Sequence, residues 1–468
     1  MSMPLPCSKA MKQRQLMKRR DFLSGVGKLA LTASASRWTR AAGAPGSPQM
    51  TLAAVGDCLV TRGFARNDPK FQPLLSILRG ADVCFGNFEM TLPDPGMYPV
   101  ATGSCGDLNN SAEGPVAEEL RWAGFNIMSV ANNHSMDYGV EGMFATAKKI
   151  GAAGISHGGT GRNLEEARAP AFFDSPRGRA ALVACASTIR PGSAASHGNG
   201  EIPGRPGLSP LRFHTTYRVE AAQFEALRKI QQQLFSGAAR ALIEPQKTEG
   251  INFLGSQFIS GAPSDTLTTP LPQDVAEISS SIRRAKRNAA LVLVSIHAHE
   301  AHGAQEIPAN FLKEFARACI DAGADVFLGH GPHLLRAIEL YKRKPIFYSL
   351  GNFIFEAEGM RQIPQEIYEA CGIAGNDPSE FFDRAMRGFA DGVFWESVVA
   401  TAKFERGDLV ELKLYPVDLQ PGLSRAERGM PIRADAEKSR AILERLSKLS
   451  ASFGTTIESE GEVGVVRL

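Results

Sequence analysis

Six of the nine histidines of this 468-residue chain stand in three short patches, and each patch closely follows an apolar run that predicts a β-strand. The densest patch holds His297, His299, Glu300 and His302. In an extended conformation His297 and His299 point to the same side. Imidazole is a common ligand for zinc, manganese and iron. This patch predicts metal binding; one buried histidine beside two solvated ones is the alternative.

His330 and His333 form a second patch, directly after the apolar run at residues 324–328. The residues between them, Gly331 and Pro332, predict a tight loop. Such a loop can direct both imidazole rings at one point, as a shared metal ion requires. A structural turn with incidental histidines is the alternative.

A third patch combines two amides, an imidazole and a carboxylate, namely Asn132, Asn133, His134 and Asp137. The amide oxygen of Asn133 can ligate a metal, and the neighbouring His134 can serve as a general acid. Asp137 stands where it can orient the imidazole ring. We therefore expect His134 and Asp137 to be catalytic. The alternative is a turn in which the asparagine side chains cap backbone groups.

Two carboxylates follow two further predicted strands. Asp57 comes after the run at residues 51–55, and Glu89 comes after the run at residues 81–85. A dinuclear metal centre needs several oxygen and nitrogen ligands, usually with a bridging carboxylate. The pattern therefore predicts a site for one or two divalent transition-metal ions, of manganese, iron or zinc. The expected ligands are Asp57, Glu89, Asn133, His297, His330 and His333.

The elements that must position these patches are short apolar strands that alternate with amphipathic helices, a pattern that favours an α/β fold. Strands are expected at residues 51–55, 81–85, 127–131, 155–157, 180–187, 290–296, 324–328, 346–350, 393–404 and 409–417. Helices are expected at residues 71–79, 112–123, 140–153, 308–322 and 434–449. The last two strands add an antiparallel hairpin. Two insertions on the same body are expected, an irregular one at residues 188–278 with a helical run at 219–235, and a mostly helical one at 357–390.

The first 44 residues predict an export signal. Twin arginines at positions 19 and 20 precede a weakly apolar stretch at 25–35 and a small-residue cleavage site at 42–44. This pattern is typical of a Tat-type signal peptide. We expect residues 1–44 to be that signal, residues 45–468 to form one domain, and the protein to reach the periplasm or cell envelope. A basic tail without this role is the alternative.

The charge balance excludes one class of partner. The first 44 residues hold nine basic residues and one acidic residue, so the remainder has 43 basic and 48 acidic residues, a net charge of −5. A mildly acidic body lacks the positive surface that nucleic-acid binding requires. We therefore expect no nucleic-acid partner.

Six motifs, taken in order, resemble one known family. They are Gly56-Asp57, Gly86-Asn87-Phe88-Glu89, Ala131-Asn132-Asn133-His134, His297-Ala298-His299-Glu300, Gly329-His330-Gly331-Pro332-His333 and Tyr348-Ser349-Leu350-Gly351-Asn352-Phe353. From about residue 51 to 355 the chain is similar to the CapA-type poly-γ-glutamate capsule biosynthesis family, within the calcineurin-like metallophosphatase superfamily. The resemblance implies a four-layer β-sandwich flanked by helices, with its core at residues 51–356 and a C-terminal completion at 357–468.

Two positions depart from the superfamily pattern. Leu59 stands where the first motif has a histidine, and His330 and His333 are three residues apart instead of two. Both departures concern metal ligands. Our hypothesis is that His299 replaces a lost ligand.

The resemblance further implies a metal-dependent hydrolase of phosphoesterase type that acts in capsule or poly-γ-glutamate biosynthesis or export. Its substrate would be an anionic polymer or a phosphoester, and a membrane-bound polymer synthase complex would be its partner. The expected substrate-binding residues are Asn87, Asn132, His299, Glu300, Arg205 and Asn352. Two alternatives are a non-catalytic polymer-binding accessory of that synthase and a general metallophosphodiesterase.

Overall fold

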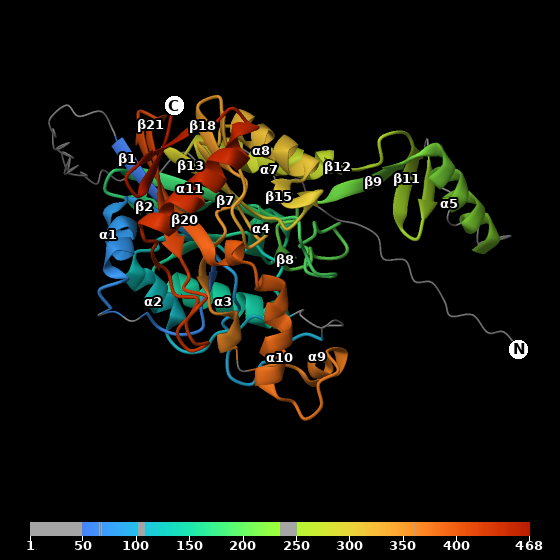
Figure 1. Ribbon diagram of the computed structural model, residues 1–468, viewed down its shortest axis with the longest axis horizontal. Coiled ribbons are helices and arrows are strands. Elements are labelled where there is room, and N and C mark those ends of the chain that lie inside the picture. The colour runs from blue at the N-terminus through green and yellow to red at the C-terminus, as the bar shows by residue number, and fades with distance from the viewer. Residues whose placement is uncertain (1–48, 65, 67, 102–107, 235–249, 361) are drawn as a thin grey trace, which may run out of the picture. The chain divides into compact units, whose positions relative to one another are not determined.

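The structure of this chain, a computed structural model, describes residues 49–64, 66, 68–101, 108–234, 250–360 and 362–468 (Figure 1). The predicted signal peptide at residues 1–44 lies outside the described residues and stays a prediction. Within the described ranges, no helix has the length and apolar character that crossing a lipid bilayer requires.

The larger of two central sheets has ten strands and contains the first strand of the described chain (Figure 1). Its main path runs in the order β23 (Ile457–Glu460), β24 (Val463–Val466), β21 (Asp408–Asp418), β20 (Glu396–Glu405), β1 (Gln49–Leu59), β2 (Val83–Phe88), β3 (Ile127–Ser129) and β4 (Ser156–Gly158). Two further strands, β19 (Asn352–Phe355) and β22 (Ile432–Arg433), pair with β1 and β21. Strands β1 to β4 are parallel neighbours, and β20 and β21 form the predicted antiparallel hairpin.

The second central sheet has six strands. Its order is β17 (Ile338–Tyr341), β18 (Lys344–Phe347), β16 (Val326–His330), β13 (Leu291–His297), β7 (Gly178–Ala186) and β6 (Ala171–Ser175). The four inner strands run parallel, and the two edge strands run antiparallel to their neighbours. Parallel strands are usually covered on both faces and therefore apolar on both, and every residue of β13 is buried.

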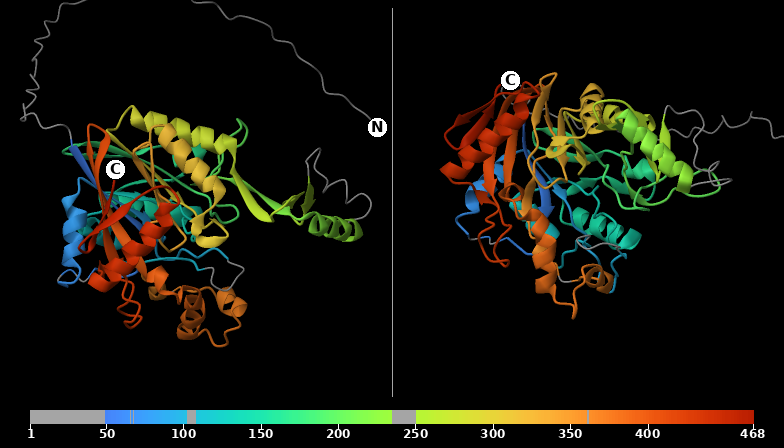
Figure 2. Two further views of the ribbon diagram at one scale, coloured as in Figure 1. Left: turned by 45° about the horizontal axis from the view of Figure 1, so that its top comes forward. Right: turned by 45° about the vertical axis from the view of Figure 1, so that its right-hand side comes forward.

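The two sheets pack face to face between two layers of helices (Figure 2). Leu52 and Phe85 of the larger sheet share one apolar core with Leu293 and Leu328 of the second sheet. The helices α1 (Gln72–Gly80), α2 (Val116–Ala123) and α3 (Gly139–Ala152) cover the outer face of the larger sheet. The helices α7 (Pro272–Lys286) and α8 (Asn310–Asp321) cover the second sheet, and α11 (Ala436–Ala451) packs on β21. The expected four-layer α/β sandwich is confirmed.

The first insertion contains more regular structure than its sequence indicates. A separate four-stranded sheet has the order β10 (Ile251–Phe253), β11 (Ser256–Ser260), β9 (Phe213–Val219) and β12 (Asp265–Pro270), and α5 (Ala221–Leu234) packs on it. Two further two-stranded sheets pair β5 (Thr160–Gly161) with β8 (Gly207–Leu208) and β14 (Ala301–His302) with β15 (Ala304–Pro308), and the short helix α4 (Leu164–Ala167) contacts β5 and β8.

The second insertion is mostly helical, as predicted. It contains η1 (Ala357–Gly359), α9 (Gln365–Ala370), α10 (Pro378–Ala385) and η2 (Met386–Phe389), and η3 (Gly392–Trp395) follows it where a strand was predicted to begin. Ile367 of α9 and Phe381 of α10 are fully buried and join the core that packs on the larger sheet. This segment is therefore part of the sandwich and not an appendage.

Several element boundaries differ from the prediction, and two of them have a clear physical reason. Strand β1 does not end at Gly56, because Asp57 still pairs with Asn87 and Asn352 on its two sides. The helix predicted for residues 112–123 begins only at Val116. The residue before it, Pro115, takes the N-cap position, because a proline has no N–H to donate and would break a longer helix.

Candidate metal centre

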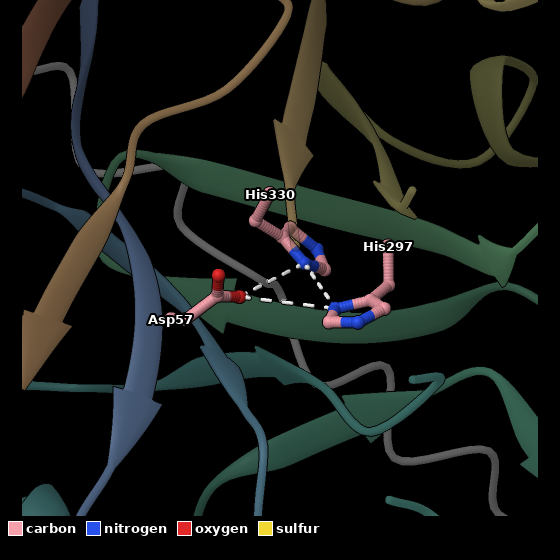
Figure 3. Close-up of side chains that lie close together, drawn as sticks. All are labelled: Asp57, His297 and His330. Atoms are coloured by element: carbon pink, nitrogen blue, oxygen red, sulfur yellow. Dashed lines mark hydrogen bonds and ion pairs between the residues drawn. The ribbon is translucent and has the colours of Figure 1, made fainter. Parts of the chain in front are cut away.

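The ends of strands from both sheets meet in one buried cluster. Asp57 lies in β1 and Glu89 directly after β2, both in the larger sheet, whereas His297 and His330 end β13 and β16 of the second sheet. His297 and His330 are register partners. Figure 3 shows Asp57 and both imidazoles pointing toward one another. The packing of the two sheets therefore brings together ligands that are far apart in the sequence.

Asp57, His297 and His330 form a first group of donors. The Oδ1 atom of Asp57 lies 3.2 Å from Nδ1 of His330 and 3.9 Å from Nδ1 of His297. The two Nδ1 atoms are 3.2 Å apart. All three side chains are buried, and their ligand atoms lie close enough together to hold one metal ion.

Glu89 organises a second group of donors. Its Oε1 atom lies 3.7 Å from Nε2 of His297 and 3.8 Å from Nε2 of His333. The Nε2 atom of His299 lies 2.9 Å from that of His297. Glu89 can share an ion with His297 and His299, or with Asp57 and His333. The structure thus brings His299 into the cluster, as the replacement hypothesis requires.

Three buried oxygen atoms test whether these residues fit a metal ion. Both carboxylate oxygens of Glu89 and the Oδ1 atom of Asn133 are buried without a hydrogen-bond partner among the described residues. Leaving such acceptors unpaired is costly, so they are nearly always satisfied. A divalent cation held by Glu89 would satisfy its oxygens, Asn133 lines the cavity beside His134, and a donor set of carboxylates, imidazoles and an amide suits zinc, manganese or iron.

The protonation states of three imidazoles agree with this assignment. Burial lowers the pKa of His297 and of His333, and it lowers the pKa of His299 to about 3. These imidazoles are therefore neutral, which is the form that binds metal. Burial raises the pKa of Glu89, and the nearby charge of Asp57 raises it further. Burial also raises the pKa of Asp57, but the hydrogen bond and the charge of His330 have a larger effect. The pKa of Asp57 is therefore lowered.

Several of the residues predicted to bind substrate lie behind the ligands instead. Asn87 and Asn132 are fully buried, and the amide of Asn87 donates to Oδ1 of Asp57 at 2.8 Å. Asn132 donates to the Asn87 side chain and to the backbone of Phe88. Neither amide faces a cavity, because the strands and loop that carry them turn them inward. Their observed role is to hold Asp57 and the loop before His134.

Asn352, also predicted to bind substrate, supports His333. Its Oδ1 atom lies 2.8 Å from Nδ1 of His333, which leaves Nε2 of the ring toward Glu89. His333 has a φ angle of 61°, in the left-handed region that costs energy for a residue with a Cβ atom. Ser295 supports His330 in the same way, with 2.7 Å between Oγ and Nε2. Such partners fix the orientation of metal ligands.

Glu300 and Arg205 also lie away from the donors. Glu300 accepts hydrogen bonds from the hydroxyls of Ser187 and Thr188, so it anchors the loop that carries His299. Arg205 is exposed and donates from Nε to the carbonyl of Ala194. The structure does not bring Arg205 to the cavity above the centre.

His134 and Asp137 form a hydrogen-bonded pair beside the donors. Nδ1 of His134 lies 2.7 Å from Oδ2 of Asp137, and Nε2 lies 3.9 Å from Oε1 of Glu89. The other oxygen of Asp137 lies 2.9 Å from Nη1 of Arg190. Sequence reasoning missed Arg190; its only signal is its place four residues after the end of β7.

A small cavity opens onto this centre. Its volume is about 270 Å³, and its lining includes Asn133, His134, His299, His333 and Leu59. The deeper donors, Asp57, Glu89, His297 and His330, are closed off from solvent. Leu59 fills the position where the superfamily has a histidine, so this wall of the cavity is apolar.

Comparison with known proteins agrees with the motifs. Residues 51–357 match the family described as "Bacterial capsule synthesis protein PGA_cap". The uncharacterized protein y4uA of Sinorhizobium fredii is 37% identical over 435 residues, 89% of this chain and 93% of its own length. The capsule biosynthesis protein CapA of Bacillus anthracis is 25% identical over 316 residues, 66% of this chain and 60% of its own. A solved structure of a hypothetical protein from Thermus thermophilus covers 79% of this chain and 99% of its own, with 15% identity and a TM-score of 0.36. On the family match, this chain belongs to the bacterial capsule synthesis proteins of the PGA_cap type.

Proposed function

We propose that this protein is an exported, metal-dependent hydrolase of phosphoesterase type that acts in capsule or poly-γ-glutamate biosynthesis or export. Its family supports the association with capsule synthesis. One observation carries the hydrolase proposal: the unpartnered oxygens of Glu89 lie among buried imidazoles beside the His134–Asp137 pair.

The residues that would hold one or two ions lie on both sheets. They are Asp57, Glu89, Asn133, His297, His299, His330 and His333. A divalent ion bound by such residues lowers the pKa of water and polarises a phosphoryl oxygen. The closed floor of the centre keeps bulk water away from the reacting group, which strengthens every electrostatic interaction there.

His134 is the residue that moves a proton. The Asp137 carboxylate holds Nδ1, so Nε2 is the atom presented toward the centre. As the water oxygen forms a bond to phosphorus, the bond from phosphorus to the leaving oxygen breaks. His134 gives its Nε2 proton to that leaving oxygen, and the charge of Asp137 stabilises the ring while it carries the proton.

Export and partners are part of the proposal. The twin arginines and the cleavage site support export. Cys371 is disulfide-bonded, and disulfides persist mainly in oxidising compartments outside the cytoplasm. An anionic polymer or a phosphoester is the proposed substrate, and a membrane-bound polymer synthase complex is the proposed partner, on the association of the family with capsule synthesis.

The test is metal analysis of protein purified without added metal, together with hydrolysis of an activated phosphodiester with added manganese. Asp57→Ala and His330→Ala are compared with Asp174→Ala, an exposed acidic control. Metal and turnover lost in the first two variants alone would support the proposal. Metal without any turnover would favour the non-catalytic, polymer-binding role, and no metal even after reconstitution would overturn the hydrolase proposal.

A further inference from the structure

The cavity above the metal centre has two unlike walls. One wall carries the polar groups of the centre, among them His134, His299 and His333. The opposite wall is apolar and comes from the chain after β18. Its side chains are Phe355, Ala357, Ala385, Met386, Phe389 and Phe394.

The apolar wall is built from aromatic rings that pack against one another. The ring of Phe389 meets the rings of Phe355, Phe394 and His333 edge to face, with centroids 5.1 to 5.5 Å apart. The backbone of Phe389 is held as well, because its carbonyl accepts a hydrogen bond from Nε1 of Trp395 at 2.8 Å. Phe355 and Phe394 are buried, whereas Phe389 is only half-buried and faces the cavity.

Among the described residues that line this cavity, none carries a lysine, arginine, aspartate or glutamate side chain. Its polar members beyond the centre are the neutral amides of Asn110 and Gln305. A carboxylate drawn out of water needs a charged or hydrogen-bonding partner, and arginine is the usual one. A group that carries carboxylates would therefore find no counter-charge here outside the metal centre.

We infer that the substrate is a phosphoester whose leaving alcohol is uncharged and apolar, with a small aromatic or branched alkyl group against Phe389. This inference rests on the proposed function. Because His134 donates to the leaving oxygen and lines the same cavity, the apolar group is assigned to the leaving side. Water adds to phosphorus, the ester bond breaks, and the alcohol departs with the proton of His134. The volume of about 270 Å³, near the lower limit of roughly 300–1,000 Å³ for small-molecule sites, restricts the group to a small one.

A binding experiment tests this specificity apart from turnover. The affinity of the metal-loaded protein is measured for phenylphosphonate, phosphonoacetate and inorganic phosphate. We expect phenylphosphonate to bind about tenfold or more tightly than phosphonoacetate, a typical contribution from a matched apolar contact. In Phe389→Ala that preference is lost while the affinity for inorganic phosphate is unchanged. Phe389→Leu retains most of the preference, and Phe172→Ala, a change at a partly exposed phenylalanine of β6, retains all of it.

A turnover experiment separates this inference from the proposed function. Release of phosphate from phenyl phosphate and from 2-phosphoglycolate is followed in the same preparations. Release that requires Asp57 but shows no preference for the phenyl ester would overturn the inference and leave the hydrolase standing. A loss of phosphate affinity in Phe389→Ala equal to that of phenylphosphonate would also overturn it, since the wall would then act only through the fold. No release from either ester by metal-loaded protein, together with no hydrolysis of the activated phosphodiester, would overturn the hydrolase itself.

Discussion

Two fully buried carboxylates of this protein, Glu89 and Asp274, have opposite surroundings. Asp274, in α7, accepts hydrogen bonds on both oxygens, from the guanidinium groups of Arg168 and Arg212 at 2.6 to 2.8 Å and from the backbone N–H of Arg212. Glu89 accepts none from the described residues, although its neighbours are imidazoles and another carboxylate. Both side chains have no exposed surface.

The difference separates a structural carboxylate from a functional one. A buried ion pair with complete hydrogen bonds is stable in itself, whereas an unpaired buried carboxylate has an effective cost of several kcal/mol. Asp274 ties α7 to the segment that carries Arg168 and Arg212. Glu89 needs a cation that the polypeptide does not supply. Both are fully buried carboxylates, so the set of partners is what identifies the metal centre.

The largest expected effect is on the stability of the fold and follows from a change at Asp274. Asp274→Asn leaves Arg168 with only the partly exposed Glu277 as a counter-charge and should lower the free energy of unfolding by up to about 3–5 kcal/mol, the usual cost of breaking a buried pair. Urea unfolding measures it. The metal content per folded molecule should stay at the wild-type value; a loss of metal in this variant would mean that the two regions are coupled.

Glu89→Gln should weaken metal binding without destabilising the fold, which is the opposite of the effect expected for Asp274→Asn. It removes a ligand charge, so we expect metal affinity to fall more than about 100-fold, beyond the roughly 10–100-fold that outer partners of a metal site contribute. Titration with manganese measures this. The metal-free variant should unfold at a urea concentration no lower than that of metal-free wild type, because no hydrogen bond is lost and an unpaired buried carboxylate is removed. A destabilisation as large as that of Asp274→Asn would contradict the comparison.

Asn352→Ala should have an intermediate effect. It removes the group that orients His333, and we expect metal affinity to fall about 10–100-fold without a change in the number of ions at saturation. Manganese titration again provides the measurement, and Asn288→Ala, at an exposed asparagine, is the matched control. If the number of ions fell, Asn352 would have to be a ligand itself.

The smallest expected effect is the dependence on pH of the stability difference between wild type and Asp274→Asn. Burial alone would raise the pKa of Asp274, but its hydrogen bonds from Arg212 and Arg168 lower it below the ordinary 3.8. A depressed pKa in the folded state contributes stability that is present above 3.8 and lost as the pH falls through the folded value. The stability gap between wild type and Asp274→Asn should therefore be constant from about pH 7 to pH 5 and shrink at lower pH. A gap that widened on acidification would contradict the assignment.

The metal donors could be predicted because they follow strand ends, where the edge of a parallel sheet gathers side chains. Asp57, Glu89, His297 and His330 each stand at such a position, and the structure brings all four together. The α/β alternation was predictable from the continuous apolar runs of the buried strands, whereas the two-sheet sandwich was expected only from the family resemblance. The sequence departures at Leu59 and His333 did not prevent the cluster from forming.

The direction of the amides could not be predicted. Asn87 and Asn352 have the residue type of a substrate contact, but the pleat of each strand turns them toward Asp57 and His333. Arg190 was missed because it follows β7 of the second sheet, whereas its partner Asp137 follows β3 of the larger sheet. No spacing in the sequence links the two residues. The strands of the first insertion were missed because short runs rich in serine and threonine have little apolar alternation.

The position of β1 has a consequence for the order of folding events. This strand is the first of the described chain, yet it pairs with β19 and β20, which lie close to the end. Contacts of such high sequence separation form slowly, since the intervening chain must first be ordered. Asp57 therefore cannot reach its final place until β19 and β20 have been synthesised. We expect metal capture to be a late, post-translational step, and an N-terminal fragment that already contains Asp57 and Glu89 to bind none.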